Sequence, residues 1–244
     1  MNEPKDKKTI EVCFTPKLFP FIMTEDNFIV VIVDILRATT SICVALDHGV
    51  KSMIPVASVD EARNYKNQGF LVASERDGKV LDFADFGNSA FNFMGEGVKG
   101  KTIVYSTTNG TKAIEMAKDS EKVVIGSFIN LSALASWLIA QERNVVILCA
   151  GWKGKFNLED SVFAGALAEK LLENENFITD CDSTKASVDL WNISRNDILK
   201  YIEKASHRTR LRNLVLDDVM EYSFTLDISR VIPALENGHI VDIS

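Results

Sequence analysis

The segment IVVIVDILRATTS, residues 29–41, places an acid, an arginine and three hydroxyl residues directly behind five consecutive β-branched apolar residues. An uninterrupted apolar run of this length is typical of a strand that is covered on both faces, as in a parallel or mixed sheet between helical layers. Thr39 and Thr40 then stand where a helix begins and can cap its first turn. The segment therefore predicts a buried strand that passes directly into a helix at a polar turn.

Strand and helix patterns alternate along most of the chain. Apolar runs predict strands at Thr9–Phe14, Phe28–Val33, Ser52–Val56, Phe70–Ala73, Thr102–Tyr105, Lys122–Ile125 and Val145–Cys149. Helical patterns lie between them at Thr40–Asp47, Ser58–Asn67, Gly110–Ala117, Leu131–Gln141 and Leu158–Asn174. Ser58 and Glu61 have capping-box spacing, and Asn130 or Ser132 can cap the helix that follows them. This alternation predicts an α/β fold, a three-layer α/β/α sandwich with a mixed, largely parallel sheet.

The pattern becomes mainly helical after about residue 175. Helices are expected at Asp197–Lys204, His207–Leu214 and Asp217–Phe224, followed by a short terminal strand at His239–Ile243. No linker rich in proline, glycine or serine separates this part from the rest, so residues 1–244 are expected to fold as one unit. The apolar faces of the helical part favour a homodimer.

Composition and charge restrict the class of ligand. The 244 residues are 46% hydrophobic and 25% charged, as in a globular protein, and the formal net charge is −7. The sequence SHRTRLRN, residues 206–213, is the one basic block, so a nucleic-acid partner has little electrostatic support. The N-terminal residues lack the layout of a secretory signal, and no apolar run approaches membrane-spanning length, which predicts a cytoplasmic protein without a membrane partner.

Polar clusters follow four of the predicted strands, at the ends where ligands bind in open α/β sheets. In the first cluster, Asp34 can hold a hard cation, Arg37 can clamp an anion with two hydrogen bonds, and Thr39 and Thr40 can bind phosphate oxygens. A surface pair of Asp34 with Arg37 and a helix cap at Thr39 would explain the same residues.

The second cluster, STTNGTKA at residues 106–113, sets hydroxyls, an amide and a glycine before a helix. Such a turn can form an anion-binding nest from backbone amides, with Gly110 free to adopt positive φ. It lacks the spacing of a Walker loop, and an ordinary helix cap is the alternative interpretation.

The third and fourth clusters add carboxylates. Glu159 and Asp160, within CAGWKGKFNLEDSVFAG at residues 149–165, open a helix and can be metal ligands or general acids and bases, or can simply complement the helix dipole. SERDG at residues 74–78 and DFADFGNSA at residues 82–90 offer a cation ligand and an anion clamp, or a solvated hairpin turn. Together, the four clusters predict a site for phosphate and a divalent cation.

The ordered segments VDILRATTS, SERDG with FGNSA, STTNGTKA and AGWKGKFNLEDSVFAG resemble the 2-phosphosulfolactate phosphatase family, the ComB-like phosphatases of coenzyme M biosynthesis. The similarity extends over nearly the full length, including the tail from SHRTRLRN to VIPALENG. Two departures occur. Ser74 and Asp77 replace glycines of the usual GERGG motif, and Ala90 replaces the proline of GNSP. Asp77 adds a carboxylate beside the anion pocket and can change the turn and the charge there.

This resemblance implies magnesium-dependent hydrolysis of 2-phospho-3-sulfolactate to 3-sulfolactate and phosphate. The residues at the family's motif positions are Asp34, Arg37, Thr39, Thr40, Glu75, Arg76, Asn88, Thr107, Thr108, Asn109, Gly110, Thr111, Glu159 and Asp160. Asp34, Arg37, Glu159 and Asp160 are expected to be catalytic, and the threonines, Arg76, Asn88, Asn109 and Gly110 to bind substrate. We expect Asp34 to hold Mg²⁺ together with Glu75, Glu159 or Asp160.

Further roles follow from chemistry. Arg37 and the amides of residues 107–111 are expected to hold the phosphoryl oxygens, and Arg76 to hold the sulfonate or carboxylate. The sequence leaves open whether Asp34 attacks phosphorus or a metal-bound water does so, and it disfavours a phosphohistidine, because none of the three histidines lies in a cluster. Two alternatives to this function remain: a phosphatase for another small 2-phospho-acid, and a non-catalytic module that binds a phosphorylated or sulfonated anion.

Overall fold

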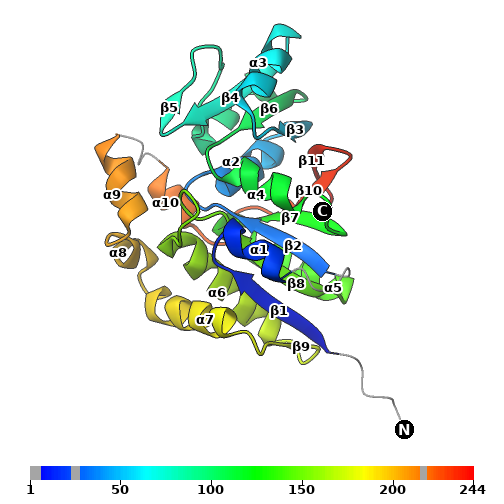
Figure 1. Ribbon diagram of the computed structural model, residues 1–244, viewed down its shortest axis with the longest axis vertical. Coiled ribbons are helices and arrows are strands. Elements are labelled where there is room, and N and C mark those ends of the chain that lie inside the picture. The colour runs from blue at the N-terminus through cyan, green and yellow to red at the C-terminus, as the bar shows by residue number, and fades with distance from the viewer. Residues whose placement is uncertain (1–6, 23–27, 215–218) are drawn as a thin grey trace.

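The computed structural model describes residues 7–22, 28–214 and 219–244. These residues form an 11-stranded sheet with helices on both faces, in the strand order β5-β4-β6-β3-β11-β10-β7-β2-β8-β1-β9 (Figure 1). The predicted three-layer α/β/α sandwich with a mixed, mostly parallel sheet is therefore confirmed. Within the described ranges, no helix is both long enough and apolar enough to cross a membrane.

The strands have the following bounds: β1 Lys8–Cys13, β2 Phe28–Val33, β3 Ser52–Pro55, β4 Leu71–Arg76, β5 Lys79–Val80, β6 Thr102–Ser106, β7 Lys122–Gly126, β8 Asn144–Cys149, β9 Phe177–Ile178, β10 Pro233–Glu236 and β11 His239–Asp242. The α-helices are α1 Phe19–Ile22, α2 Ala38–Asp47, α3 Val59–Asn67, α4 Gly110–Ala117, α5 Leu131–Gln141, α6 Leu158–Leu172, α7 Asp182–Ser194, α8 Ile198–Ile202, α9 Ser206–Asn213 and α10 Met220–Ser223. Short 3-10 helices lie at Pro16–Leu18, Ala90–Phe93, Glu96–Val98 and Phe128–Asn130.

The sheet consists of two parallel blocks joined by the C-terminal hairpin β10-β11. Strands β4, β6 and β3 are parallel to one another, as are β7, β2, β8, β1 and β9. Strand β11 is antiparallel to β3, and β10 is antiparallel to both β11 and β7, so the two blocks run in opposite senses. The twist of the sheet sets the strands of the two blocks at a clear angle to each other (Figure 1).

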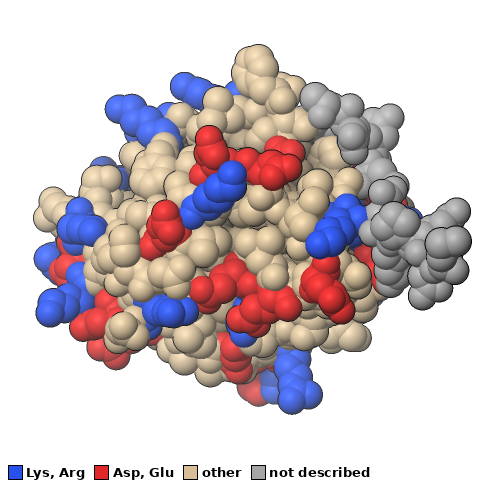
Figure 2. Space-filling view, turned by 90° about the horizontal axis from the view of Figure 1, so that it is seen from below, with Lys and Arg blue, Asp and Glu red and all other residues tan. Residues whose placement is uncertain are grey.

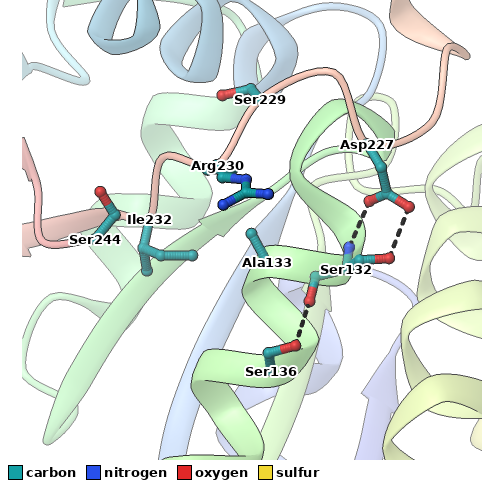
Figure 3. A pocket seen from close by; sticks show the side chains of 8 residues that line it. All are labelled: Ser132, Ala133, Ser136, Asp227, Ser229, Arg230, Ile232 and Ser244. Carbon is teal, nitrogen blue, oxygen red and sulfur yellow. Dashed lines mark hydrogen bonds between the residues drawn. The ribbon is translucent and has the colours of Figure 1, made fainter.

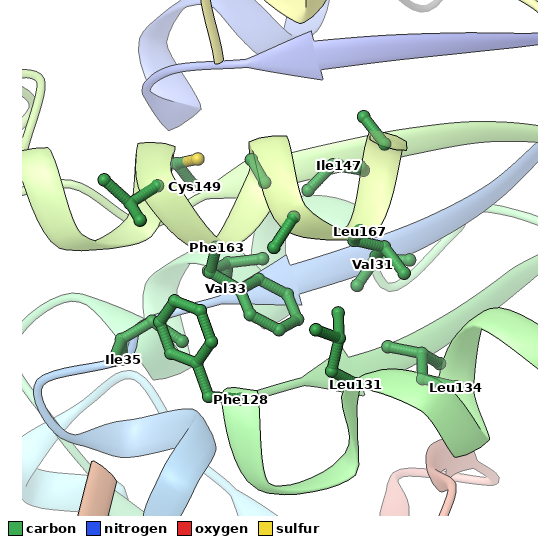
Figure 4. Packing of buried hydrophobic residues seen from close by; sticks show 14 of the residues in the cluster. Val31, Val33, Ile35, Phe128, Leu131, Leu134, Ile147, Cys149, Phe163 and Leu167 are labelled. Atoms are coloured by element: carbon green, nitrogen blue, oxygen red, sulfur yellow. The ribbon is translucent and has the colours of Figure 1, made fainter. Parts of the chain in front are cut away.

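Strand β2 is buried on both faces, as the sequence predicts. Val31 and Val33 pack in one cluster with Phe163 and Leu167 of α6 and with α5 (Figure 4). The intervening residues of β2 pack in a second cluster with α2 and α4 on the other face. Alternate side chains therefore anchor both helical layers to one strand, which fixes the position of the polar turn that follows Val33.

Helix α7 covers α6, and the sequence analysis missed it. The carbonyl oxygen of Ser187 lies so close to Gly165 of α6 that a Cβ at Gly165 would meet it at 1.9 Å. Thr184 and Ser187 are fully buried on the inner side of α7, so small polar residues occupy places where apolar residues would reveal a helical period. Strands β5, β9 and β10 were also missed, and each has only two to four residues.

The predicted helix caps have different outcomes. Ser58 accepts a hydrogen bond from the amide of Glu61 (3.4 Å), which confirms that cap. Asn130 occupies the N-cap position of α5 as predicted, but its side chain makes no capping hydrogen bond there, because it forms a capping box with Ser127 around a short 3-10 helix. Ser132 lies inside α5 and bonds Asp227. In the C-terminal part, α8, α9 and α10 correspond to the three predicted helices, although the predicted start of the last helix lies outside the described residues.

Candidate active site at the strand ends

One small pocket gathers residues from both parallel blocks and from α9. Its lining residues are Asp34, Leu36, Arg37, Glu75, Asn88, Thr107, Thr108, Asn109, Trp152, His207, Arg210 and Leu211. The first seven polar members come from the ends of β2, β4 and β6 and from the loop before the 3-10 helix at Ala90. The structure thus brings Asp34, Arg37, Glu75, Asn88 and Thr107–Asn109 together, although they are far apart in the sequence.

The turns after β2 and β6 approach each other so closely that position 110 requires glycine. A Cβ at Gly110, the first residue of α4, would lie 2.6 Å from Cβ of Ala38 and 2.9 Å from Oδ2 of Asp34. Because the blocks run in opposite senses, a flat sheet would put their carboxyl ends at opposite edges. The twisted sheet instead brings the turn after β6 against the turn after β2, so the site forms between blocks and not along one straight rim.

Asp34 is a buried carboxylate at the end of β2. Its Oδ1 lies 3.5 Å from the amide nitrogen of Ala38, and its own amide donates to Oγ1 of Thr39 (3.1 Å). Burial raises the pKa of Asp34 to about 6, an effect that His207 and the Ala38 amide oppose and that the charges of Glu159 and Glu75 increase. The negative charge of Asp34 is therefore energetically unfavourable unless a cation binds to the carboxylate, and without a cation the carboxylate tends to bind a proton.

Arg37 forms a buried ion pair with Glu75, with Nη2 of the arginine against Oε2 of the carboxylate. The two side chains are 3% and 12% exposed, and the pair links the turn after β2 to the end of β4. The Nε atom of Arg37 is buried and has no hydrogen-bond partner. A guanidinium that is held in one orientation and keeps a free N–H is suited to an anion such as phosphate.

The turn from β6 to α4 is braced by its own hydroxyls. The amide of Thr107 donates to Oγ1 of Thr111 (3.2 Å), and the amide of Thr111 donates to Oγ1 of Thr107 (3.3 Å). Two neighbouring loops join the turn, because the amide of Asp77 donates to Thr108 and the amide of Lys153 donates to Oδ1 of Asn109 (3.2 Å). The turn is therefore fixed on the pocket side, but the amides of Thr107 and Thr111 are used within it, and those of Lys112 and Ala113 donate to the Asn109 carbonyl oxygen.

Asn88 is held by a buried tyrosine. The hydroxyl of Tyr105 donates to Oδ1 of Asn88, and Oγ of Ser41 donates to the Asn88 carbonyl oxygen (3.3 Å). Burial raises the pKa of Tyr105 well above its usual value, so this hydroxyl keeps its proton. With its oxygen engaged by a donor, the amide group of Asn88 presents its Nδ2 donor for other contacts.

Glu159 and Asp160 lie side by side at the start of α6 but have different surroundings. Asp160 accepts the amide of Ile35 at Oδ1 (2.9 Å) and the amide of Gly151 at Oδ2 (3.1 Å). Burial, followed by the charges of Asp34 and Glu159, raises the pKa of Asp160 well above its usual value. With both oxygens bound to backbone, Asp160 ties the turns after β2 and β8 together and is not in the pocket lining.

Glu159 has one engaged oxygen and one open oxygen. Its Oε1 accepts from Nδ2 of Asn157 (3.1 Å) and lies 2.6 Å from Nδ1 of His207. Its Oε2 is buried without a hydrogen-bond partner, as is Oδ1 of Asn157. Two unsatisfied buried oxygens on neighbouring side chains are costly unless a donor or a cation meets them.

Several predicted site residues serve the framework. Arg76 donates to the carbonyl oxygens of Glu75 (2.8 Å) and Ala57 (3.1 Å) and to Oγ of Ser106 (2.8 Å), and it does not line the pocket. Thr40 donates to the carbonyl oxygen of Ile35 (3.0 Å) and contacts Ser127. The predicted site residues outside the lining are Thr39, Thr40, Arg76, Gly110, Thr111, Glu159 and Asp160.

Sequence reasoning missed the wall of the pocket formed by Trp152, His207 and Arg210. The rings of Trp152 and His207 stack with centroids 5.2 Å apart, and the guanidinium carbon of Arg210 lies 3.8 Å from the Trp152 ring centroid. His207 and Arg210 belong to the basic block at residues 206–213, which was the one available signal. From the sequence alone, this block looked like an isolated basic helix face. Only the fold shows that α9 lies beside the strand ends.

The site offers few side-chain ligands for a metal ion. Across residues 7–22, 28–214 and 219–244, no group of three or more His, Cys, Asp and Glu side chains is arranged to hold a metal ion. Mg²⁺ usually takes only one or two carboxylates and completes its shell with water and substrate phosphate. Asp34, whose pKa is raised by burial and also by the charge of Glu159, and the open oxygens of Glu159 and Asn157 fit that smaller set.

A wider pocket lies elsewhere, between the start of α5 and the segment before β10 (Figure 3). Its lining is Ser132, Ala133, Ser136, Asp227, Ser229, Arg230, Ile232 and Ser244. The carboxylate of Asp227 already accepts from the amide and the hydroxyl of Ser132, both at 2.6 Å. None of the predicted site residues lines this pocket, so the smaller pocket at the strand ends is the candidate active site.

The surface charge agrees with local recognition of an anion. On the face shown in Figure 2, acidic side chains gather across the middle and basic side chains are scattered among them. With a formal net charge of −7, the protein as a whole repels anions. An anionic ligand therefore depends on the few cations and amides of the pocket itself.

Comparison with known proteins identifies similar chains. Residues 13–238 match the family described as 2-phosphosulpholactate phosphatase. A protein of Caldanaerobacter subterraneus subsp. tengcongensis described as "Probable 2-phosphosulfolactate phosphatase" is 38% identical over 213 residues, which cover 86% of this chain and 88% of that protein. Proteins with the same description from Thermotoga maritima (36% over 208 residues, 85% and 89% covered) and Prochlorococcus marinus (41% over 194 residues, 75% and 79% covered) are also similar.

Proposed function

Because this chain belongs to the 2-phosphosulfolactate phosphatase family, we propose that it hydrolyses the phosphate ester of 2-phospho-3-sulfolactate to 3-sulfolactate and phosphate. The observation that carries the proposal is the meeting of Asp34 and Arg37 with Thr107–Asn109 in one pocket. A carboxylate, an oriented guanidinium and a helix-start turn are the groups that phosphoryl transfer requires.

The proposal includes a magnesium ion. Asp34 and Glu159 would hold it, and when bound it would offset the negative charge of the phosphoryl group. The open oxygens of Glu159 and Asn157 support this assignment, as does the raised pKa of Asp34, because a cation would favour the charged carboxylate. A role in coenzyme M biosynthesis and a cytoplasmic location stay predictions from the sequence.

The protein residues position the phosphoryl group. Arg37, fixed by Glu75, offers its Nε and remaining N–H groups to non-bridging oxygens, and Nδ2 of Asn88 offers a further donor. Trp152 and Leu211 add apolar surface to the pocket lining. Donors that are fixed before the reaction stabilise the charge of the transition state without reorganisation.

One observation favours a second candidate, a phosphatase for another small 2-phospho-acid. Asp77 forms an ion pair with Lys153 (2.9 Å) at the pocket rim, where the family usually has glycine. The lysine and its hydrogen bond lower the pKa of Asp77 below the usual value, so the carboxylate is charged. The pair balances its own charge, and it changes the turn that contacts Thr108, so the contacts of a second acid group can differ from those in relatives with glycine at this position.

The test is phosphate release by the purified protein from 2-phosphosulfolactate, 2-phospholactate and phosphoglycolate, with Mg²⁺ and with a chelator in excess. We expect release with Mg²⁺ that chelation abolishes, with the preferred ester identifying the substrate. Binding of these esters without release of phosphate from any of them would contradict hydrolysis and support a binding module.

A further inference from the structure

Arg210 differs from the other cations around the pocket. Arg37 is paired with Glu75, Lys153 is paired with Asp77, and Arg76 is bound to backbone carbonyl oxygens. Among the residues that the structure describes, no carboxylate forms an ion pair with Arg210, and its Nη2 is buried without a hydrogen-bond partner. The pocket therefore contains a guanidinium with an open donor.

The side chain of Arg210 is held in place by two aromatic rings. Its guanidinium carbon lies 3.8 Å from the centroid of Trp152, and its Nη1 lies 3.4 Å from Nε2 of His207. His207 is in turn fixed by Glu159, which lies 2.6 Å from its Nδ1. Because an arginine can only donate, a hydrogen bond at this contact requires the His207 tautomer whose proton lies on Nδ1, between the ring and Glu159. This chain of contacts fixes the plane of the guanidinium.

The positions of the two cationic groups match a molecule with two anionic ends. Arg37 and the turn after β6 lie on the strand-end side, where they suit the phosphoryl group. Arg210 lies on α9, which forms the other wall of the same pocket. A planar guanidinium recognises carboxylates and sulfonates through parallel hydrogen bonds, and an anion at Nη2 would satisfy the buried donor.

We propose that Arg210, oriented by Trp152 and His207, binds the second acid group of the substrate, a carboxylate or a sulfonate, and so selects phosphate esters that carry such a group. The inference rests on the proposed phosphatase function and deepens it. Arg210 takes the role that the sequence suggested for Arg76, because the donors of Arg76 are used by Glu75, Ala57 and Ser106.

The test compares three variants, R210Q, R210K and the matched control R212Q. Arg212 lies on the same helix but pairs with Glu203, and its side chain is 52% exposed. The kcat/KM of each protein is measured with 2-phosphosulfolactate, with phosphoglycolate and with ethyl phosphate, which has no second acid group. Far-ultraviolet circular dichroism and urea unfolding establish that each variant is folded.

We expect R210Q to lower kcat/KM about 10- to 100-fold for 2-phosphosulfolactate, mainly through KM, and less than about 3-fold for ethyl phosphate. R210K should recover part of the loss, and R212Q should match the wild type. A larger loss with 2-phosphosulfolactate than with phosphoglycolate assigns the sulfonate to Arg210, and equal losses assign the carboxylate. An equal loss with ethyl phosphate, or no loss at all, would overturn the inference.

A binding measurement separates this inference from the proposed function. Sulfolactate is titrated into wild type, R210Q and R212Q, with tryptophan fluorescence as the readout, because Trp152 contacts Arg210 directly. Binding that R210Q weakens at least about 10-fold supports the inference even if the wild type releases no phosphate from any ester. Equal affinity in wild type and R210Q, or no binding to either, would overturn it even if the phosphatase activity is present.

Discussion

The two sides of the pocket are built in different ways. The strand-end side, defined by Asp34, Arg37, Glu75 and Thr107–Asn109, holds its charged groups by ion pairs and backbone hydrogen bonds. The α9 side, defined by Trp152, His207 and Arg210, holds its cation by ring stacking and leaves a donor open. The difference indicates that the sheet fixes the groups for phosphoryl chemistry, whereas the helical C-terminal part selects the rest of the ligand.

The largest effect is expected from Asp34→Asn on the strand-end side. Loss of the carboxylate charge should lower kcat at least about 100-fold, the size of effect seen when one transition-state interaction is removed. Folding should persist, because the buried charge itself is costly. Steady-state kinetics and urea unfolding measure both quantities, with Asp82→Asn, an exposed residue paired with Arg63, as the control. Near-normal turnover in Asp34→Asn would show that Asp34 does not take part in the reaction.

Gly110→Ala tests whether the two blocks must meet at the strand-end side. The new Cβ would lie 2.6 Å from Cβ of Ala38 and 2.9 Å from Asp34, so overpacking should cost about 1–3 kcal/mol of unfolding free energy and displace Asp34. Gly97→Ala is the control, because a Cβ there meets nothing within 4 Å. Denaturant unfolding of both variants gives the comparison. Equal stability of the two would show that the turns after β2 and β6 separate easily.

The raised pKa of Asp34 predicts a pH dependence of stability for the metal-free protein. The folded state has a pKa of about 6 where the unfolded value is 3.8, so the folded state binds the Asp34 proton more tightly. The contribution of Asp34 to the free energy of unfolding therefore falls as the pH rises through the folded-state pKa. The expected loss is about 2 kcal/mol between about pH 4.5 and about pH 7.5.

Urea unfolding across this range checks the prediction, with Asp34→Asn as the reference. The difference in unfolding free energy between the variant and the wild type should grow with pH, because only the wild type loses a proton at residue 34. A difference that stays constant, or that shrinks with rising pH, would indicate that Asp34 is not the buried, proton-binding carboxylate of the strand-end side.

The smallest effect is expected at the rim. Lys153 and Asp77 are 56% and 63% exposed, and an exposed ion pair contributes at most about 0.5–1 kcal/mol. Lys153→Gln should change the unfolding free energy by less than about 0.5 kcal/mol and kcat/KM by less than about 3-fold. Asp77→Asn is the matched variant from the other side of the pair. A 10-fold loss of kcat/KM in Lys153→Gln, without a similar loss in Asp77→Asn, would show that Lys153 binds the anionic substrate.

The same contrast explains what could be predicted from the sequence. Strand β2 and helices α4 and α5 have the predicted bounds, because apolar runs and polar turns are local signals. Asp34 and Arg37 follow β2 directly, so the strand-end side could be located once ligands were expected at the ends of strands. The residues that share this side come from two blocks of opposite sense, and no local pattern reveals that arrangement.

The α9 side could not be located in this way. His207 bonds Glu159 across 48 residues, and Arg210 reaches Trp152 only because α6, α7 and α8 fold back between them. Arg76 and Arg210 look alike in the sequence, and only the contacts show that the donors of Arg76 are used by Ala57 and Ser106. Helix α7 was missed because Thr184, Ser187 and Ser194 lie with Trp191 on its buried face, so the apolar period is interrupted by small polar residues. The single-unit organisation of residues 1–244 and the homodimer stay predictions.

A crystal structure of the protein soaked with Mg²⁺ and 3-sulfolactate tests the central claim, that the strand-end side and the α9 side form one cation-assisted site. The ion is predicted to contact Asp34, and an acid group of sulfolactate is predicted to contact Arg210 in the same pocket. Sulfolactate bound instead in the pocket of Ser132 and Arg230, or an ion that does not touch Asp34, would contradict the claim.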